Sequence, residues 1–383
     1  MAAIAIGPGF VAKGTLNLTT SWGVAMAGPS KSWLAMTVSL GLLALPGCVG
    51  ASDGQAATEE NGAAVVTIAP QPLRTTESAA PPRAESFADF IDGVRADALA
   101  AGVKPATLDA ALAGVTHIDR VIELDRKQPE FSLSFSTYLD RIVTPARVAE
   151  GKRKLEENRD LLAAIERRYG VQPRFIVALW GIETGFGRNT GGMSVVSSLA
   201  TLAYDGRRSA YFRTELMQAL TILDQGHIAP SAMVGSWAGA MGQCQFMPST
   251  FVKFAVDWDG DGRRDIWRNQ GDALASAANY LSSEGWIGDQ TWGRAVDVPE
   301  GLSAELTGVD KTRTLAEWSR LGIHAADGKP LPQRDIRASL IRAEQGKGQP
   351  FLVYDNFRTI MKWNRSTFFA LAVGHLADRI GDR

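Results

Sequence analysis

Ala178-Leu-Trp-Gly-Ile-Glu-Thr-Gly-Phe-Gly-Arg188 is the stretch that decides the fold, since it places one carboxylate at the end of an apolar segment. The apolar run over residues 175–182 predicts a buried helix, and Gly185 and Gly187 predict its end. Burial disfavours a charged carboxylate, so we expect the pKa of Glu183 to be raised. A group that donates a proton near neutral pH needs that property. The alternative is a structural Glu at a helix C-terminus, satisfied by the following arginine or by backbone amides.

A second motif, Gly235-Ser-Trp-Ala-Gly-Ala-Met-Gly-Gln-Cys-Gln-Phe-Met-Pro-Ser249, follows about sixty residues later. Its glycines allow a backbone or a ligand to approach closely. Gln243 and Gln245 place amide groups among apolar side chains, which suits a sugar-binding cleft better than a core. The two motifs in this order resemble those of the lytic murein transglycosylase B family, and the similarity runs from about residue 87 to 380.

The resemblance implies an α+β fold that is mostly α. It has a lysozyme-like catalytic core, an N-terminal helical region and a small inserted β-rich subdomain. It also implies an enzyme, a peptidoglycan lytic transglycosylase that cleaves the β-1,4 bond between N-acetylmuramic acid and N-acetylglucosamine. Glu183 would act first as acid and then as base, and leave 1,6-anhydro ends. No cofactor is implied for this chemistry.

The resemblance further implies the residues that bind the glycan strand, at the positions that match the family's cleft. These are Tyr138, Ser236, Gln245 and Tyr280. Near the C-terminus the family tends to carry another tyrosine, where this chain has Trp363 and Phe369. We therefore expect a hydroxyl contact to be lost there, while aromatic stacking persists.

Composition restricts the other classes of function. With 45% hydrophobic and 21% charged residues, the 383-residue chain has ample material for a large core. Its net charge of −1 offers no basic patch for nucleic acid and no polybasic membrane tether. We expect a monomer. The four histidines form no HxxxH-type metal pair, and no serine or cysteine nucleophile is paired with a histidine, which leaves carboxylate chemistry.

Two alternatives remain open. A hydrolytic muramidase on the same fold would need a second carboxylate across the cleft. Asp205 and Glu215 are near in sequence, but we expect them to form ion pairs with Arg207, Arg208 or Arg213. The other alternative is a non-catalytic lipoprotein that binds calcium or cell wall.

The N-terminal region predicts export and a lipid anchor. Lys31 precedes an apolar run over residues 33–45 that is too short to span a bilayer and fits a signal peptide. We assign residues 1–47 to this signal, with Met26 as an alternative start. Leu45-Pro-Gly-Cys48 resembles a lipobox, which would make Cys48 the lipidated first residue. The alternative is an ordinary cleaved signal followed by an incidental cysteine.

The implied location is the periplasmic face of the outer membrane of a Gram-negative cell, because Val49 stands where an Asp would signal inner-membrane retention. If Cys48 is acylated, Cys244 has no partner for a disulfide. Residues 48–85 are rich in small residues and proline and predict a lipidated, disordered tether.

The remaining chain divides by composition. Residues 86–291 and 351–383 predict the helical and lysozyme-like catalytic region, and residues 292–350 predict the small β-rich subdomain. Ser86 is the expected cap of the first helix, and Pro173 the first residue of the Glu183 helix. We expect one long helical segment over residues 141–164.

An acidic loop predicts a calcium site. Asp257-Trp-Asp-Gly-Asp-Gly-Arg-Arg-Asp265 matches the front of an EF-hand loop, with ligands from Asp257, Asp259, Asp261 and the carbonyl of Arg263. Arg268 replaces the bidentate Glu, so Asp272 is the candidate last ligand, as the resembled family suggests. Without a flanking helix pair in the sequence, we predict a structural clamp instead of a sensor. An acidic turn without an ion is the alternative.

Overall fold

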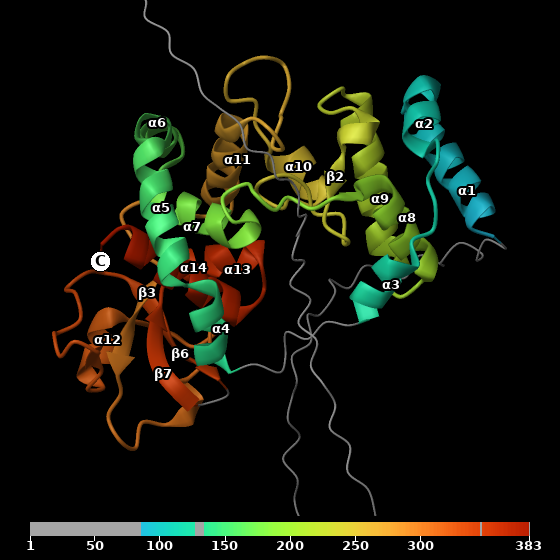
Figure 1. Cartoon of the computed structure of the whole chain (residues 1–383). Coiled ribbons are helices and arrows are strands. Elements are labelled where there is room, and N and C mark those ends of the chain that lie inside the picture. Colours follow the sequence, from blue (N-terminus) through green and yellow to red (C-terminus); the bar gives the residue numbers. More distant parts are fainter. Residues whose placement is uncertain (1–85, 127–133, 345–346, 383) are drawn as a thin grey trace, which may run out of the picture. The chain divides into compact units, whose positions relative to one another are not determined.

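Helix α7, Pro173–Thr184, carries Glu183 and is apolar and buried over residues 175–181. The computed structural model describes residues 86–126, 134–344 and 347–382. Pro173 is the first residue of α7, where its missing N–H costs no hydrogen bond. A helix without a polar face has to be covered on all sides. Accordingly α7 packs against α5, Pro145–Glu157, and α14, Thr367–Ile380, which lie beside it in Figure 1.

The described part of the chain is mostly helical, as predicted. The remaining helices are α1 (Phe87–Ala100), α2 (Pro105–Leu112), α3 (Asp119–Arg126), α4 (Phe135–Ile142), α6 (Arg159–Tyr169), α8 (Val195–Asp205), α9 (Ser209–Asp224), α10 (Pro248–Phe254), α11 (Gln270–Ser283), α12 (Leu315–Arg320) and α13 (Asp355–Trp363), with short 3-10 turns at Pro230–Ala232 and Ala304–Leu306.

Helix boundaries follow local capping signals. Ser86 caps α1 in a capping box with Asp89, and Ser366 caps α14 by accepting a hydrogen bond from the Phe369 amide, as the sequence predicts. The prediction of a single helical segment over residues 141–164 is wrong, because the chain forms two helices there. Asn158 ends α5 and starts α6, because its side chain donates to the Lys154 carbonyl and competes with continuation of the helix.

A five-stranded antiparallel sheet forms the β-rich subdomain, in the order β4–β6–β7–β3–β5. The strands are β3 (Gly293–Asp297), β4 (Thr312–Thr314), β5 (His324–Ala325), β6 (Arg337–Glu344) and β7 (Lys347–Val353). Leu340 faces Leu352 across the central pair, and both belong to a separate small core around Trp318 and Tyr354. Because β7 continues to Val353, the sheet runs slightly past residue 350.

A two-stranded ribbon joins the two sequence motifs. Strand β1, Met193–Ser194, follows the end of α7 and pairs with β2, Val234–Gly235, which opens the glycine-rich motif. The antiparallel register pairs Met193 with Gly235. This pairing places the glycine-rich motif beside the end of the Glu183 helix.

The predicted signal peptide, Cys48 and the tether over residues 48–85 lie outside the described residues. Among the residues that are described, none of the helices combines the length and the apolar character that a membrane span requires.

Candidate active site

The chain leaves α7 through an uncommon backbone conformation directly after Glu183. Gly185 ends the helix at φ 58°, and Phe186 continues in the left-handed region at φ 63°. That region is unfavourable for a residue with a bulky side chain, so surrounding contacts have to hold Phe186 there. Its amide donates to the Trp180 carbonyl (3.1 Å), and its ring packs edge-on against the Trp180 ring with centroids 5.7 Å apart.

Gln243 ties the glycine-rich motif to α7. Its side-chain oxygen accepts from the Trp180 indole N–H (3.1 Å), and its carbonyl accepts from the Thr184 hydroxyl (2.9 Å). Gly187 makes this approach possible, because a Cβ there would lie 2.6 Å from the Gln243 side-chain oxygen. Only 7% of Gln243 is exposed, and its side-chain amide is hydrogen-bonded to Trp180 and to the Trp267 carbonyl. It is a buried structural link.

The two oxygens of Glu183 have different surroundings. Oε1 accepts a hydrogen bond from Nε1 of Trp363 (2.8 Å). Oε2 accepts none from the residues described, and it is not among the fully buried polar atoms that lack a partner, so it is not completely enclosed. Burial raises the pKa of Glu183 to about 7, against the Trp363 hydrogen bond, which lowers it. This agrees with the elevated pKa expected from the sequence.

Trp363 adds a contact that we did not predict for the C-terminal segment. We expected a hydroxyl contact to be lost there while aromatic stacking persists. The indole N–H of Trp363 donates to Glu183. It also packs edge-on against Tyr280, with ring centroids 4.8 Å apart, and lies 5.3 Å from the ring of Phe246. Sequence reasoning treated tryptophan as a stacking group; the overlooked signal was that its N–H can replace a tyrosine hydroxyl as donor.

The structure brings Tyr280 to Glu183 through Trp363. Tyr280 lies on α11, is 8% exposed, and also packs on Phe254 at 4.6 Å between centroids. Burial, with a smaller contribution from the charge of Glu284, raises the pKa of its hydroxyl to about 12. Tyr280 therefore stays neutral throughout the physiological pH range.

The other three predicted binding residues lie on neighbouring elements. Tyr138 is part-exposed on α4, and its ring packs against Phe368 of α14 at 5.6 Å. In the turn after β2, the Ser236 hydroxyl accepts from the Ala240 amide (3.1 Å). Gln245, at φ 51°, donates from Nε2 to carbonyl oxygens in that turn and in the loop after α7. The side chains of Ser236 and Gln245 thus also stabilise the loops they occupy.

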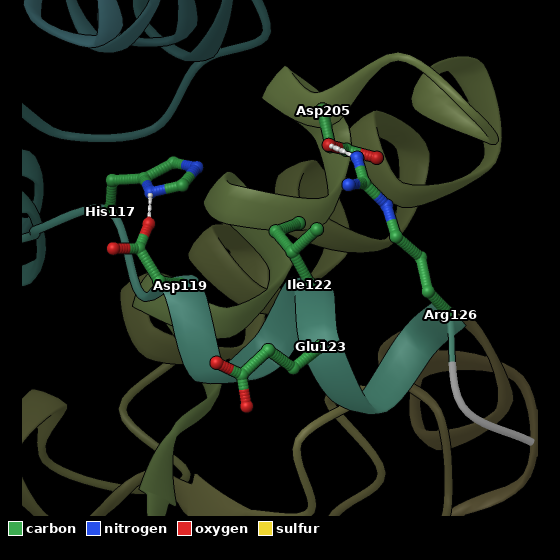
Figure 2. Close-up of a pocket in the computed structure, with 6 residues that line it drawn as sticks. All are labelled: His117, Asp119, Ile122, Glu123, Arg126 and Asp205. Atoms are coloured by element: carbon green, nitrogen blue, oxygen red, sulfur yellow. Dashed lines mark hydrogen bonds and ion pairs between the residues drawn. The ribbon is translucent and has the colours of Figure 1, made fainter.

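Asp205 and Glu215 have other partners than we predicted. Asp205 forms an ion pair, but with Arg126 (2.8 Å), in the shallow pocket of Figure 2. Glu215 is 2% exposed and accepts from the amide and hydroxyl of Ser249 (2.8 and 2.7 Å) instead of from an arginine. Neither carboxylate contacts Glu183 among the described residues. The pocket in Figure 2 contains none of the predicted site residues.

The acidic loop is flanked by two helices, α10 and α11. Our inference from the sequence that no helix pair flanks it is therefore wrong. Asp257, Asp259 and Asp272 bring carboxylate oxygens within 4.8 Å of one another, while Asp261 lies outside this group. Asp272 is fully buried. Burial raises its pKa, and the charges of Asp259 and Asp257 raise it further, against two backbone amides that lower it.

The donors of this carboxylate group fit a hard divalent cation, since all of them are oxygen and they converge from both ends of the loop. Backbone amides of the acidic loop donate hydrogen bonds to carboxylates of the same loop and so stabilise its turns. Asp257 accepts from the amides of Gly260 (2.7 Å) and Gly262 (2.8 Å), and the Arg263 amide donates to Asp261 (2.8 Å).

The acidic loop is also joined to α7. The Gln243 amide donates to the Ile266 carbonyl (2.9 Å), and the Trp267 indole donates to the Val234 carbonyl of β2 (3.1 Å). The Asp265 amide in turn donates to Asp272 (2.7 Å). A hydrogen-bonded path therefore runs from the carboxylate group to Gln243 and on to the end of the Glu183 helix.

Comparison with known proteins agrees with this geometry. Residues 86–378 match the family described as "Transglycosylase SLT domain". The membrane-bound lytic murein transglycosylase B of Escherichia coli (strain K12) is 32% identical over 289 residues, which are 71% of this chain and 77% of that protein. The chain belongs to this family of lytic transglycosylases, and its fold is lysozyme-like, as the two motifs led us to expect.

Solved structures are similar over most of the described residues. SltB3 from Pseudomonas aeruginosa, in complex with NAG-anhNAM-pentapeptide, is 44% identical with a TM-score of 0.76, covering 78% of this chain and 80% of that one. Slt35 from Escherichia coli, in complex with calcium, is 30% identical with a TM-score of 0.65, covering 77% and 92% respectively.

The raised pKa of Glu183 predicts a pH-dependent cost in stability. Between its ordinary pKa of 4.5 and about 7, the unfolded chain has released this proton and the folded chain has kept it, so stability falls as pH rises through that window. Glu183→Gln removes this fall. Between pH 4 and pH 8, the free energy of unfolding of the variant should therefore rise by about 1–3 kcal/mol relative to that of wild type. This range allows for the partial exposure of the carboxyl group.

Chemical denaturation of both proteins at several pH values measures this difference. Glu300→Gln, at an exposed position, is the matched control and should parallel wild type throughout. Parallel curves for wild type and Glu183→Gln would show that the Glu183 carboxyl has an ordinary pKa.

Proposed function

We propose that the chain cleaves the glycan strands of peptidoglycan as a lytic transglycosylase, with Glu183 as its only catalytic carboxylate. The observation that carries the proposal is the surroundings of Glu183. Its pKa of about 7 leaves the carboxyl partly protonated at neutral pH, and burial and Trp363 account for that value without a neighbouring carboxylate. One group can therefore supply a proton and then accept one.

In the proposed reaction, Glu183 protonates the glycosidic oxygen between N-acetylmuramic acid and N-acetylglucosamine, and the bond from C1 to that oxygen breaks. The resulting carboxylate takes the proton of the muramic C6 hydroxyl, whose oxygen bonds to C1. No water is consumed. Tyr138, Ser236, Gln245 and Tyr280 bind the strand, and their dipoles stabilise the positive charge that develops at C1.

Relatives support this reaction type. SltB3 has been observed with NAG-anhNAM-pentapeptide and with NAG-NAM-pentapeptide, which contain muramic acid in its anhydro and its ordinary form. The hydrolytic alternative requires a second carboxylate near the first. Among the described residues, Asp205 and Glu215 are committed to other partners, which favours the transglycosylase.

The products of purified sacculi test both the reaction and the residue. We expect muropeptides with 1,6-anhydromuramic ends, lighter by one water than hydrolytic products. Glu183→Gln should lower turnover by at least about 100- to 10,000-fold, the range for loss of a general acid–base, while the fold persists. Mass spectrometry of the digests gives both answers. Mainly reducing ends would identify a muramidase, and a variant within threefold of wild type would exclude Glu183.

We also propose a structural calcium ion in the acidic loop, held by Asp257, Asp259, Asp261, Asp272 and the carbonyl of Arg263. The support is the group of three carboxylates and the Slt35 structure, which is in complex with calcium. The ion would relieve the repulsion among these charges. It has no role in the chemistry at Glu183.

Calcium should raise the melting temperature by a few degrees. At about 100 times Kd the linkage contribution is about 2.7 kcal/mol. Because Arg268 replaces the bidentate Glu, we expect a Kd of about 0.1–1 mM. Scans at about 10 mM calcium, which is about 10 to 100 times this Kd, are compared with scans in EDTA. Asp257→Ala should abolish the shift, and Asp92→Ala, on an exposed face of α1, should retain it. Magnesium should act more weakly. If calcium does not change the melting temperature of the wild-type protein, the loop is an acidic turn that binds no ion.

Finally, we propose that the protein is lipidated at Cys48 and held at the periplasmic face of the outer membrane. The support is the Leu45-Pro-Gly-Cys48 sequence and the relative that is named as membrane-bound. Cys48→Ser should move the protein into the soluble periplasmic fraction and leave its activity unchanged. Fractionation with immunodetection measures this. A Cys48→Ser protein that stays with the membranes would argue for another anchor.

A further inference from the structure

Trp363 makes the two oxygens of Glu183 chemically unequal. Oε1 is held by the indole N–H at 2.8 Å, while Oε2 has no partner among the described residues and is not completely enclosed. An indole has one N–H and no acceptor, so it can only donate in this hydrogen bond. Oε1 must therefore be the accepting oxygen whether the carboxyl is protonated or ionised.

From this donor-only contact we infer that Trp363 is a positioning residue, which confines the catalytic proton to Oε2 of Glu183. The inference rests on the proposed function. A proton on Oε1 would turn it into a hydroxyl oxygen, which accepts a hydrogen bond from the indole N–H less well than a carbonyl oxygen does, so the 2.8 Å contact favours the proton on Oε2. The same oxygen then serves both steps. The Oε2 proton moves to the glycosidic oxygen as that bond breaks, and Oε2 receives the C6 hydroxyl proton as the new C6 oxygen–C1 bond forms.

The indole is held in place by the rings around it. Trp363 is the last residue of α13, and Tyr280 and Phe246 pack against its ring. Because these contacts fix the ring plane, the N–H direction is set before substrate binds. Such preorganisation is what an effective proton donor requires, since no side chain has to reorient during the reaction.

Two other titratable groups near this contact, Cys244 and Tyr280, stay neutral. Burial raises the pKa of the Cys244 thiol, with a further contribution from the Glu183 charge, and the thiol donates to the Ala273 carbonyl (2.9 Å). Burial also raises the pKa of Tyr280 to about 12. Glu284, the charged group nearest Tyr280, is paired with Lys253 (3.0 Å) and Lys362 (3.3 Å). Of these four groups, only Glu183 has a pKa near neutral, so a shift of the profile on loss of the Trp363 N–H is assigned to Glu183.

The test removes the N–H and keeps the ring. Trp363→Phe, and a second protein with 3-benzothienylalanine at position 363, lose the donor; the latter retains the indole shape. We expect kcat on a soluble glycan tetrasaccharide to fall about 10- to 100-fold, the effect of losing a hydrogen bond to a charged group. KM should change little. The basic limb of the kcat/KM profile should move upward in pH. The hydrogen bond from Trp363 lowers the pKa of Glu183, so its removal raises that pKa.

Trp318→Phe is the matched control, since its indole donates to a carbonyl in the separate core of the β-sheet (2.9 Å). It should leave the pH profile unmoved. If both position-363 variants keep wild-type kcat and profile while Glu183→Gln is inactive, the inference fails and the proposed function stands. If they lose activity without a shift of the basic limb, Trp363 is merely structural. An active Glu183→Gln would overturn the function itself.

Discussion

The hydrogen bonds of Gln243 are the constraint on which the arrangement of the active site depends. One buried side chain and its backbone join the end of α7, the glycine-rich turn and the acidic loop. These segments are separated by about 60 and 20 residues in sequence, and removal of the side-chain amide would leave the buried indole N–H of Trp180 without its acceptor. Gly187 leaves room for the side chain, which explains a glycine immediately after the strained Phe186.

The surroundings of Glu183 disfavour the charged form of its carboxyl group. Burial of the apolar residues of α7 stabilises the fold. Ionisation of Glu183 at the end of this helix lowers the free energy of unfolding, because the charged carboxylate is poorly solvated there. Trp363 opposes this effect by one hydrogen bond and keeps the pKa near 7. Burial and a single donor thus adjust one carboxyl to both halves of a reaction in which it first gives and then takes a proton.

The acidic loop shows how a site distant from the chemistry can still support it. Asp272 lies on α11, the helix that also carries Tyr280, and its carboxylate holds the amide of Asp265. From there the Ile266 carbonyl reaches Gln243. The conformation of the acidic loop is therefore coupled to the conformation of the glycine-rich turn that contacts α7. This link is made of backbone and buried amide groups, whose hydrogen bonds are strong in a dry interior.

The sequence by itself determined the elements whose causes are local. The apolar run, Pro173 and Gly185 fixed the limits of α7, Ser86 and Ser366 fixed helix starts, and the end of an apolar helix was enough to predict a raised pKa for Glu183. Only the tertiary structure decided which side chains meet. Trp363 is 180 residues from Glu183, and the partners of Asp205, Glu215 and Gln243 also come from distant elements. Caps and helix ends depend on neighbours within a few residues, whereas these contacts depend on how helices pack, which no local pattern records.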